Sequence, residues 1–181
     1  MTTDAPNIEV LEGEQCPICG EKTLTLTEMT RDIAFFGELS LFSMTCSSCH
    51  YHKADVESLE EHEPAKFSFT VESEEDLKVR VIKSSMGLVK FGRLGSIEPG
   101  EAANGYITNI EGLINRIKQR IEFIRDNSDD ADERKKAKNH MKKITRVLWG
   151  QEALTITIED PTGNSAIISE KAEKTKLKKK K

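Results

Sequence analysis

Two Cys-x-x-Cys pairs constrain this chain more than any other feature of its sequence. They contain all four cysteines of the 181 residues and read Cys16-Pro17-Ile18-Cys19 and Cys46-Ser47-Ser48-Cys49. The turn inside each pair points both sulfurs the same way, so two pairs can supply the four thiolates of a tetrahedral Zn²⁺ site. The 26 residues between the pairs exceed the roughly 15–20 of a compact site of this type. The sequence therefore predicts one structural zinc ion bound by Cys16, Cys19, Cys46 and Cys49, with a long β-hairpin between the pairs.

Two disulfides or a redox-active pair are the alternatives for these cysteines. A disulfide within Cys-x-x-Cys closes a cramped ring, and the sequence before the first pair does not look like a secretory signal. A redox pair would be a single motif at the start of a helix, whereas both pairs here have turn-like and strand-like flanks. His50 is a weaker candidate ligand, because four sulfurs already complete a tetrahedral shell. Gly20 and His50 each follow a pair where we expect a left-handed backbone.

The composition indicates a modest core and an uneven charge. Hydrophobic residues make up 36% of the chain, and no apolar run reaches the roughly 18 residues that a membrane-spanning helix needs. Residues 171–181 hold seven lysines and one glutamate, which leaves 20 basic and 30 acidic residues, a formal charge of −10, in the rest. Such an acidic body argues against a nucleic-acid-binding face. Reduced cysteines and no visible secretion signal predict a cytoplasmic protein.

The first third of the chain is expected to be a lead followed by the zinc ribbon. We predict a flexible N-terminal lead over residues 1–14 and the ribbon over residues 15–53. Residues 23–27 alternate apolar and hydroxyl side chains, which is typical of a half-buried strand. Phe35 and Phe36 lie near the expected hairpin turn, where paired aromatic residues either pack the hairpin or form an exposed anchor for a partner. They are our candidate partner-binding residues.

Residues 54–170 are predicted to form a second, β-rich domain. The chain first crosses over in a polar segment, and then apolar and polar side chains alternate in three stretches, residues 67–71, 77–81 and 154–158. Glycines between these stretches end short strands, as in a sandwich or a rolled barrel. Because helices interrupt the strand pattern, the last strands should close a barrel begun earlier.

Residues 109–149 are predicted to form an αα-hairpin within this domain. Two apolar stripes at helical spacing are separated by a polar turn, and a capping box begins at Thr108. Ser128 or Asp129 is the expected cap of the second helix, and Gly150 should end it. The Lys-rich tail, residues 171–181, is expected to be disordered. The predicted fold class is therefore mainly β with an inserted helical hairpin (α+β).

These motifs, in their order and spacing, resemble the ZPR-type zinc-finger proteins over nearly the whole chain. The matching segments are Cys16 to Gly20, Ile33 to Cys46, the second cysteine pair, Asp76-Leu77, Val81 to Ser84, Ile97 to Gly100, Gly105 to Leu113 and Asp160 to Ser165. The resemblance implies a four-cysteine zinc ribbon followed by a double-stranded β-helix, a jelly-roll-like domain that bears a helical hairpin. Eukaryotic members carry two such units in tandem, and this chain has one, like an archaeal form.

The resemblance also implies a binding protein rather than an enzyme. Eukaryotic members bind the GDP-bound translation elongation factor one-alpha and are implicated in its folding, and they are also described as binding the cytoplasmic part of a growth-factor receptor kinase. We therefore expect a zinc-binding protein-interaction module whose partner is a translation elongation factor GTPase. His50 stands where the family usually has Gly, and Ala34 where it usually has Pro. Neither departure removes a sulfur ligand.

Two other functions remain open at this point. A nucleic-acid-binding zinc ribbon could use the lysine tail as an electrostatic arm, although the acidic body weighs against it. An enzyme could hold a metal in the barrel with histidines and a carboxylate. However, His50 and His52 belong to the ribbon, while His62 and His140 fall in the crossing segment and a helix. The sequence also contains no nucleophile–base motif.

Overall fold

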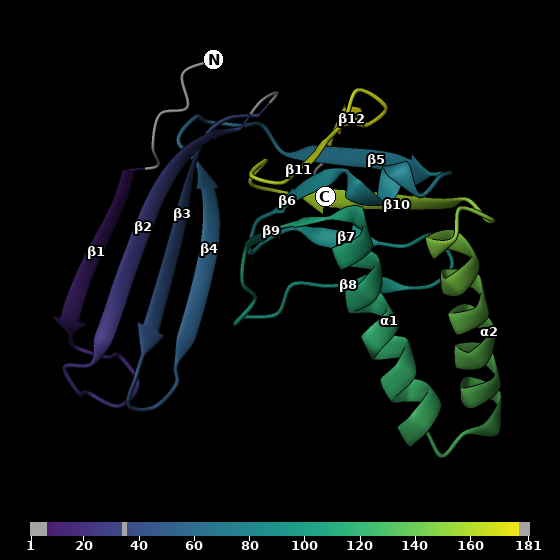
Figure 1. Cartoon of the computed structure of the whole chain (residues 1–181), viewed down its shortest axis with the longest axis horizontal. Coiled ribbons are helices and arrows are strands. Elements are labelled where there is room, and N and C mark those ends of the chain that lie inside the picture. The colour runs from purple at the N-terminus through teal and green to yellow at the C-terminus, as the bar shows by residue number, and fades with distance from the viewer. Residues whose placement is uncertain (1–6, 34–35, 178–181) are drawn as a thin grey trace.

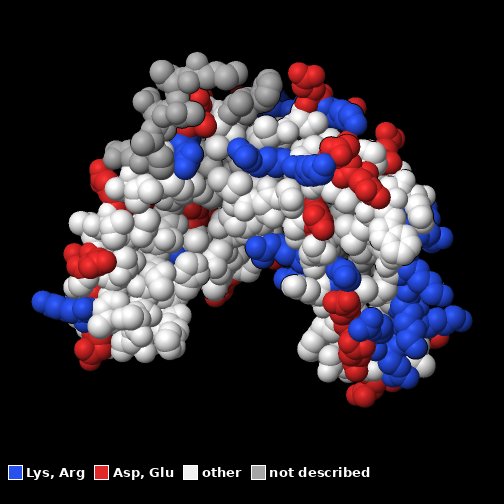
Figure 2. Space-filling view, in the orientation of Figure 1, with Lys and Arg blue, Asp and Glu red and all other residues white. Residues whose placement is uncertain are grey.

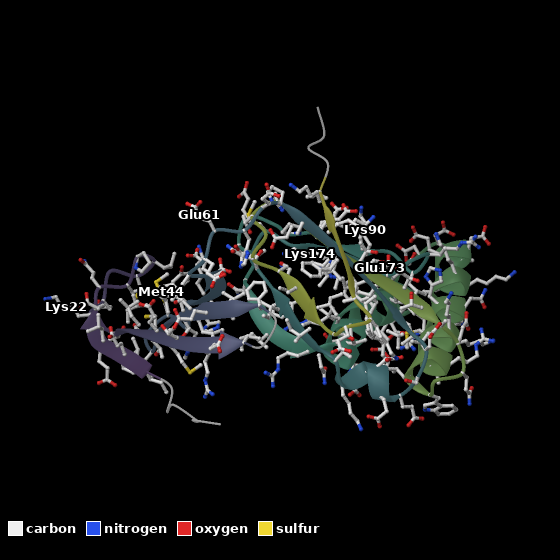
Figure 3. The ribbon with its side chains drawn as sticks, turned by 90° about the horizontal axis from the view of Figure 1, so that it is seen from above. Lys22, Met44, Glu61, Lys90, Glu173 and Lys174 are labelled. Atoms are coloured by element: carbon white, nitrogen blue, oxygen red, sulfur yellow. The ribbon has the colours of Figure 1, made fainter. Side chains whose placement is uncertain are left out.

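The part of the chain that the structure describes forms three β-sheets and a pair of α-helices that together make an arch (Figure 1). The computed structural model describes residues 7–33 and 36–177. One side of the arch is a four-stranded sheet and the other is the helical hairpin, with the remaining sheets joining them. Seen from above, Met44 of the four-stranded sheet and Lys22, which precedes one of its strands, lie at one end of the molecule and α2 at the other (Figure 3).

The four-stranded ribbon sheet has the antiparallel order β1-β2-β3-β4. Its strands are β1 (Asn7–Glu14), β2 (Leu24–Ile33), β3 (Gly37–Cys46) and β4 (His52–Ser58). The pairing of β2 with β3 runs from Leu24 opposite Cys46 to Ile33 opposite Gly37. This confirms the long hairpin that the spacing of the cysteine pairs predicts.

Both edges of the ribbon sheet differ from the sequence-based prediction. Residues 7–14 were expected to be flexible and instead form β1, and residues 54–58 were assigned to the next domain but continue the sheet within β4. Most side chains of these two strands are exposed, and Val56 is the one buried residue of β4. Main-chain hydrogen bonds to the neighbouring strand stabilise such edges, and they leave no apolar period in the sequence.

The other two sheets form the jelly-roll domain. One has the order β12-β5-β10-β7-β8 and the other β11-β6-β9. The strands are β5 (Ala65–Val71), β6 (Arg80–Lys83), β7 (Leu88–Lys90), β8 (Ser96–Ile97), β9 (Tyr106–Asn109), β10 (Leu154–Asp160), β11 (Ala166–Ile168) and β12 (Glu173–Lys176). The late strand β10 pairs with the early strands β5 and β7. The strands after the helices therefore close the domain, as the sequence predicts.

Strand β10 shows how alternation in the sequence becomes a core. Leu154, Ile156 and Ile158 are buried on one face of the strand, and Asp160 continues this inward row as a fully buried carboxylate. Its oxygens accept hydrogen bonds from the hydroxyls of Ser84 and Ser165 and from Thr162. A buried charge needs such partners, so this network connects β10 to the segments that follow β6 and precede β11.

The helical hairpin consists of α1 (Ile110–Asn127) and α2 (Ala131–Leu148). The caps differ slightly from those expected: Asn109 accepts a hydrogen bond from the N–H of Gly112, and Asp130 accepts one from Asp132. Gly150 follows α2 with a φ of 64°, as expected of the residue that ends a helix. Neither described helix is long and apolar enough to span a membrane.

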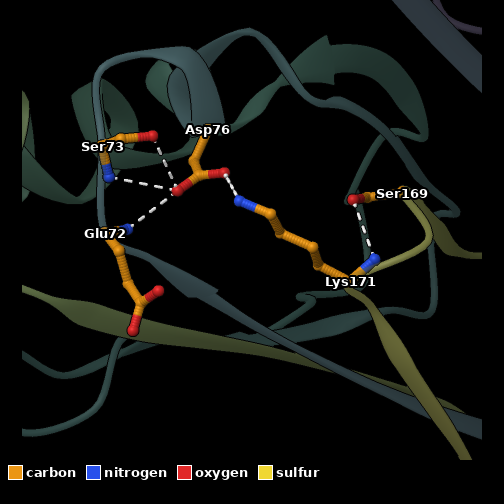
Figure 4. Close-up of polar contacts among 5 residues, drawn as sticks. All are labelled: Glu72, Ser73, Asp76, Ser169 and Lys171. Carbon is orange, nitrogen blue, oxygen red and sulfur yellow. Dashed lines mark hydrogen bonds and ion pairs between the residues drawn. The ribbon is translucent and has the colours of Figure 1, made fainter.

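The start of the C-terminal tail is ordered, which corrects the expected disorder over residues 171–181 for its described part. Strand β12 pairs with β5, and Lys171 donates a hydrogen bond of 2.9 Å to the buried carboxylate of Asp76 (Figure 4). Asp76 also accepts from the N–H groups of Glu72 and Ser73. These bonds fold the chain into the 3₁₀ helix η1 (Glu75–Lys78) where the alternating pattern indicated a strand.

Candidate metal centre

Two turns of the same shape present the four cysteines. In the first, the N–H of Gly20 donates to the carbonyl of Cys16 at 2.9 Å, and in the second the N–H of His50 donates to Cys46 at 3.1 Å. Gly20 has a φ of 77° and His50 a φ of 59°, which confirms the left-handed backbone expected at both positions. The two turns are brought together because β2 begins at Leu24, soon after the first pair, and pairs there with Cys46, the residue at which β3 ends.

The sulfur atoms have the separations of a tetrahedral zinc site. The four lie within 4.8 Å of one another, and the Cys16–Cys49 and Cys19–Cys46 distances are both 3.7 Å. Zinc–sulfur bonds of about 2.3 Å in a tetrahedron place the sulfurs about 3.8 Å apart. All four cysteines are free thiols rather than disulfides. The donor set therefore fits one zinc ion whose four positions are all filled by protein.

Hydrogen bonds from the surrounding turns favour thiolate at this centre. The N–H of Cys49 and the hydroxyl of Thr23 approach the Cys46 sulfur at 3.5 and 3.3 Å and lower the pKa of Cys46 to about 6. At Cys49 the N–H of Tyr51 lowers the pKa, but burial and the three neighbouring sulfurs outweigh it and raise the pKa to about 12. Four crowded sulfurs cannot all ionise without a compensating cation, and a bound metal is such a cation.

The apolar cluster around the centre is small. Cys16, Leu24 and Cys46 are the buried residues there, with Leu26, Met44 and Tyr51 packed against them. Within residues 7–33 and 36–177, no second group of Cys, His, Asp or Glu has the spacing of a metal site. His50 is not part of the cluster, and His52 instead shares a hydrogen bond with Thr45.

The prediction that Phe35 and Phe36 bind a partner has a different outcome for each residue. Phe35 lies outside the described residues. Phe36 is 9% exposed, belongs to the main hydrophobic core and lies against the ring of His62, with 5.0 Å between ring centroids. The prediction of an exposed partner-binding tip is therefore wrong for Phe36, which follows the packing alternative instead. The turn folds back onto the jelly-roll domain, and that tertiary contact is not visible in a local sequence pattern.

Two family models match the two parts of the chain. Residues 7–64 match the ZPR1 zinc-finger domain, and residues 75–181 match the ZPR1 jelly-roll domain. The chain belongs to the ZPR1 family. This agrees with the four-sulfur centre and with the jelly-roll fold that carries a helical hairpin.

Individual relatives support the same assignment. A ZPR1-like protein of Pyrococcus horikoshii is 40% identical over 95% of this chain and 79% of its own length. A ZPR1-like protein of Methanocaldococcus jannaschii is 35% identical over 92% of this chain and 85% of its own length. The zinc finger chaperone of Schizosaccharomyces pombe is 30% identical over 84% of this chain, which corresponds to 33% of the yeast protein. A Bos taurus relative that is 25% identical over 84% of this chain is named a zinc finger protein.

The joint between the ribbon sheet and the jelly-roll domain is a feature that sequence reasoning missed. The N–H of Gly105 donates to the carbonyl of Ala54, and the side chain of Asn104 accepts from the N–H of Ala54. The Asp55 carboxylate accepts from the N–H of Ser85 at 3.0 Å. A side chain at Gly105 would overlap this carboxylate, so the close approach requires glycine there. A glycine at position 105 is the one sequence signal of this close approach. The segment that Gly105 contacts is about 50 residues away, and no local pattern identifies that segment.

Proposed function

We propose that this ZPR1-family protein is a zinc-structured binding module that binds a translation elongation factor GTPase of the one-alpha type or assists its folding. The zinc ion holds the ribbon turns in register and takes part in no reaction, because all four coordination positions are filled by sulfur. The chaperone name of the Schizosaccharomyces pombe relative supports a protein partner. The choice of an elongation factor rests on kinship with the eukaryotic members.

The observation that carries the proposal is the shape of the molecule. The ribbon sheet and the helical hairpin stand on either side of a hollow, and basic side chains lie at its upper edge (Figure 2). The main-chain hydrogen bond between Gly105 and Ala54 connects the ribbon sheet to the jelly-roll domain that carries the helical hairpin. A preformed concave surface lowers the ordering cost of binding, which suits a protein that captures another protein.

Exposed apolar side chains occur at the two free ends of this arch. Ile18, in the first cysteine turn, is 67% exposed, and Phe123, near the end of α1, is 68% exposed. Large exposed apolar side chains that are rimmed by polar residues often mark protein-binding surfaces. A partner that fills the hollow would contact both the metal end of the ribbon and the helical hairpin.

Binding to purified archaeal elongation factor one-alpha tests the proposal. Zinc-loaded protein should retain the GTPase on an affinity column, and it should raise the yield of active GTPase recovered after dilution from denaturant. The Cys46→Ser variant and the chelated wild-type protein are the controls for the metal. Retention equal to that of an unrelated acidic zinc protein would refute the proposed partner.

A separate experiment distinguishes this proposal from nucleic-acid binding. Gel shifts with RNA and with duplex DNA, repeated on a chain shortened after residue 177, should show only weak, salt-sensitive attraction that depends on the lysine tail. We further propose that the protein works in the cytoplasm, where thiols stay reduced. Fractionation of cells that express a tagged chain tests this directly.

A further inference from the structure

A pocket of about 670 Å³ lies between α1 and the segment that joins β8 to β9. In Figure 1 this segment runs beside α1 along the hollow of the arch. The pocket is lined by three basic residues, Lys83 from β6 and Arg116 and Arg120 from α1. Tyr106 from β9 also lines it. Glu98 is the only carboxylate residue among the lining side chains. The pocket is therefore positively charged within a chain whose overall charge is −4.

Lys83 is the least expected of these residues, because its side chain is only 3% exposed. Its ammonium makes no hydrogen bond and no ion pair with any residue that the structure describes, and it lies 5.5 Å from the centre of the Tyr106 ring. Burial lowers the pKa of Lys83 and the charge of Arg116 lowers it further, while the charges of Asp55 and Asp160 act in the opposite direction. Among the described residues no buried side-chain nitrogen or oxygen lacks a hydrogen-bond partner, so solvent reaches the Lys83 ammonium, and an anion in the pocket could pair with it.

The two arginines complete the positive wall of the pocket. Arg116 stacks on the ring of Tyr106, with 3.9 Å from the guanidinium carbon to the ring centre. Arg120 lies four residues further along α1 and so projects from the same face. Within the described chain neither guanidinium forms an ion pair. Guanidinium groups bind carboxylates and phosphates through two parallel hydrogen bonds.

The rim of the pocket decides between these two kinds of anion. Phe123 and Ile124 are 68% and 42% exposed at its edge, and Ile97 and Pro99 line the opposite side. A phosphate makes no favourable contact with an apolar rim. The sequence also has no glycine-rich loop whose N–H groups could bind a phosphate. An extended peptide with acidic and apolar side chains matches both surfaces. We propose that the pocket binds an acidic, partly apolar segment of the protein partner, an inference that rests on the proposed protein-binding function.

A labelled peptide tests this assignment without the partner itself. The probe is a fluorescein-labelled peptide with the sequence Gly-Asp-Phe-Asp-Leu-Glu-Gly, and the comparison is its neutral analogue with Asn and Gln. Anisotropy with zinc-loaded full-length protein should show binding of the acidic peptide alone. Loss of two charge-assisted pairs in Arg116→Gln/Arg120→Gln should weaken this binding by about tenfold or more. Lys135→Gln/Lys138→Gln removes the same charge from exposed positions of α2 and should change it less than about twofold.

A second pair of variants tests the apolar rim. Phe123→Ala should weaken binding of the acidic peptide about three- to tenfold, the usual range for loss of an aromatic contact in an interface. Trp149→Ala removes a similarly exposed aromatic residue, which is 63% exposed outside the pocket, and should have no effect. Zinc content and circular dichroism verify the fold of each variant, and Phe123→Ala keeps the test valid if the arginine double variant is unstable.

Three results would overturn the assignment. They are equal binding of the neutral peptide, equal binding by the arginine and lysine double variants, and displacement of the acidic peptide by low concentrations of inorganic phosphate or pyrophosphate, which would make the pocket a phosphate site.

Failure of the proposed function would give a different set of results. If the elongation factor is not retained while the acidic peptide still depends on Arg116 and Arg120, the pocket is correct and the partner is another protein. If the factor is retained but the peptide is not bound, only the pocket assignment is wrong.

Discussion

The two ends of the ribbon sheet are stabilised in different ways. Around the cysteines the buried residues are too few to hold a sheet together by themselves. At the opposite end, Ile33, Phe36, Leu39 and Val56 are buried and belong to the same core as the jelly-roll domain. One end of the sheet therefore depends on a metal, and the other depends on apolar packing against the neighbouring domain.

This difference shows that the two sequence domains are not independently stabilised, because they share one hydrophobic core. The ribbon and the jelly roll match separate family models, yet the hairpin turn of the ribbon completes the core of the jelly roll. Packing fixes the direction of the ribbon, and the metal end extends away from the core (Figure 1). The cysteine turns are thus left free to contact a partner.

Loss of zinc is expected to produce the largest effect, and it should be confined to one end of the sheet. Structural zinc sites contribute on the order of 10 kcal/mol of apparent binding free energy in small domains. Chelation, or Cys46→Ser, should abolish hydrogen-exchange protection in residues 15–27 and 43–53 while strands β5 and β10 keep theirs. Mass spectrometry of exchanged peptides measures both regions. Equal loss of protection in β5 and β10 would show that the two ends are not independent.

Phe36→Ala should have the opposite regional pattern. Removal of a buried phenylalanine costs about 3–5 kcal/mol, and the side chain is 9% exposed in the main core. Urea unfolding should show this loss in the whole molecule, while the folded variant still binds one zinc ion per chain. A cost below about 1 kcal/mol would mean that Phe36 contributes little to the core. Loss of zinc from the folded variant would mean that the two ends of the sheet are coupled.

Gly105→Ala tests the joint between the regions. An added Cβ would lie 2.8 Å from the N–H nitrogen of Val56 and would overlap the carboxylate of Asp55. We expect a destabilisation of about 1–3 kcal/mol, typical of overpacking, and faster exchange of the β4 amides. Gly100→Ala is the matched control, because a Cβ there meets no atom within 4 Å. Equal stability of the two variants would contradict the close approach.

The sequence predicts those parts of the fold that have a local cause. The spacing of the cysteines requires a hairpin between them, the alternation in residues 154–158 requires one buried face, and the stripe from Ile110 to Ile121 requires a helix that packs on a core. In each case the residue type and its spacing specify the structure without knowledge of the rest of the chain.

Other parts depend on contacts that no local pattern records. Strands β1 and β12 expose most of their side chains and are paired with a neighbour through the main chain. The buried position of Phe36 depends on His62 and the jelly-roll core. Lys83 and Arg116 meet at Tyr106 only because β6 pairs with β9. The four ligands could therefore be predicted from the sequence, whereas the pocket could not.

The bond between Asp76 and Lys171 should make the jelly-roll domain sensitive to strong acid. The pKa of Asp76 is lowered from 3.8 to about 2 by hydrogen bonds from the Lys171 ammonium, the backbone N–H of Glu72 and the Ser73 hydroxyl. Because the folded pKa is the lower one, the carboxylate stabilises the fold above pH 4, and this contribution is lost as the pH falls from about 4 to about 2. After a discount for the exposed Lys171, it amounts to about 1–2 kcal/mol.

Urea unfolding of the wild-type protein and of Asp76→Asn measures this contribution. The stability difference between them should be constant from pH 7 to about pH 5 and should shrink below pH 4, because the wild type then loses the ionised carboxylate as well. Zinc release in acid affects both proteins and cancels in the difference. A stability difference that stays constant down to pH 2 would contradict the pKa assignment.

The smallest effect concerns the two cysteine turns and the residue that each has at the left-handed position, Gly20 in the first and His50 in the second. Gly20 adopts its φ of 77° without strain, whereas His50 has a Cβ at a φ of 59°. A left-handed backbone costs a residue with a side chain roughly 1–2 kcal/mol, and glycine loses about 0.5–1 kcal/mol more entropy on folding. His50→Gly should therefore stabilise the metal end by at most about 1 kcal/mol, and Gly20→Ala should destabilise it by a similar amount. Competition for zinc with a chromophoric chelator detects both changes. If His50→Gly instead weakens zinc binding, the imidazole contributes to the site in a way that compensates for its strained backbone, and the two turns are not equivalent.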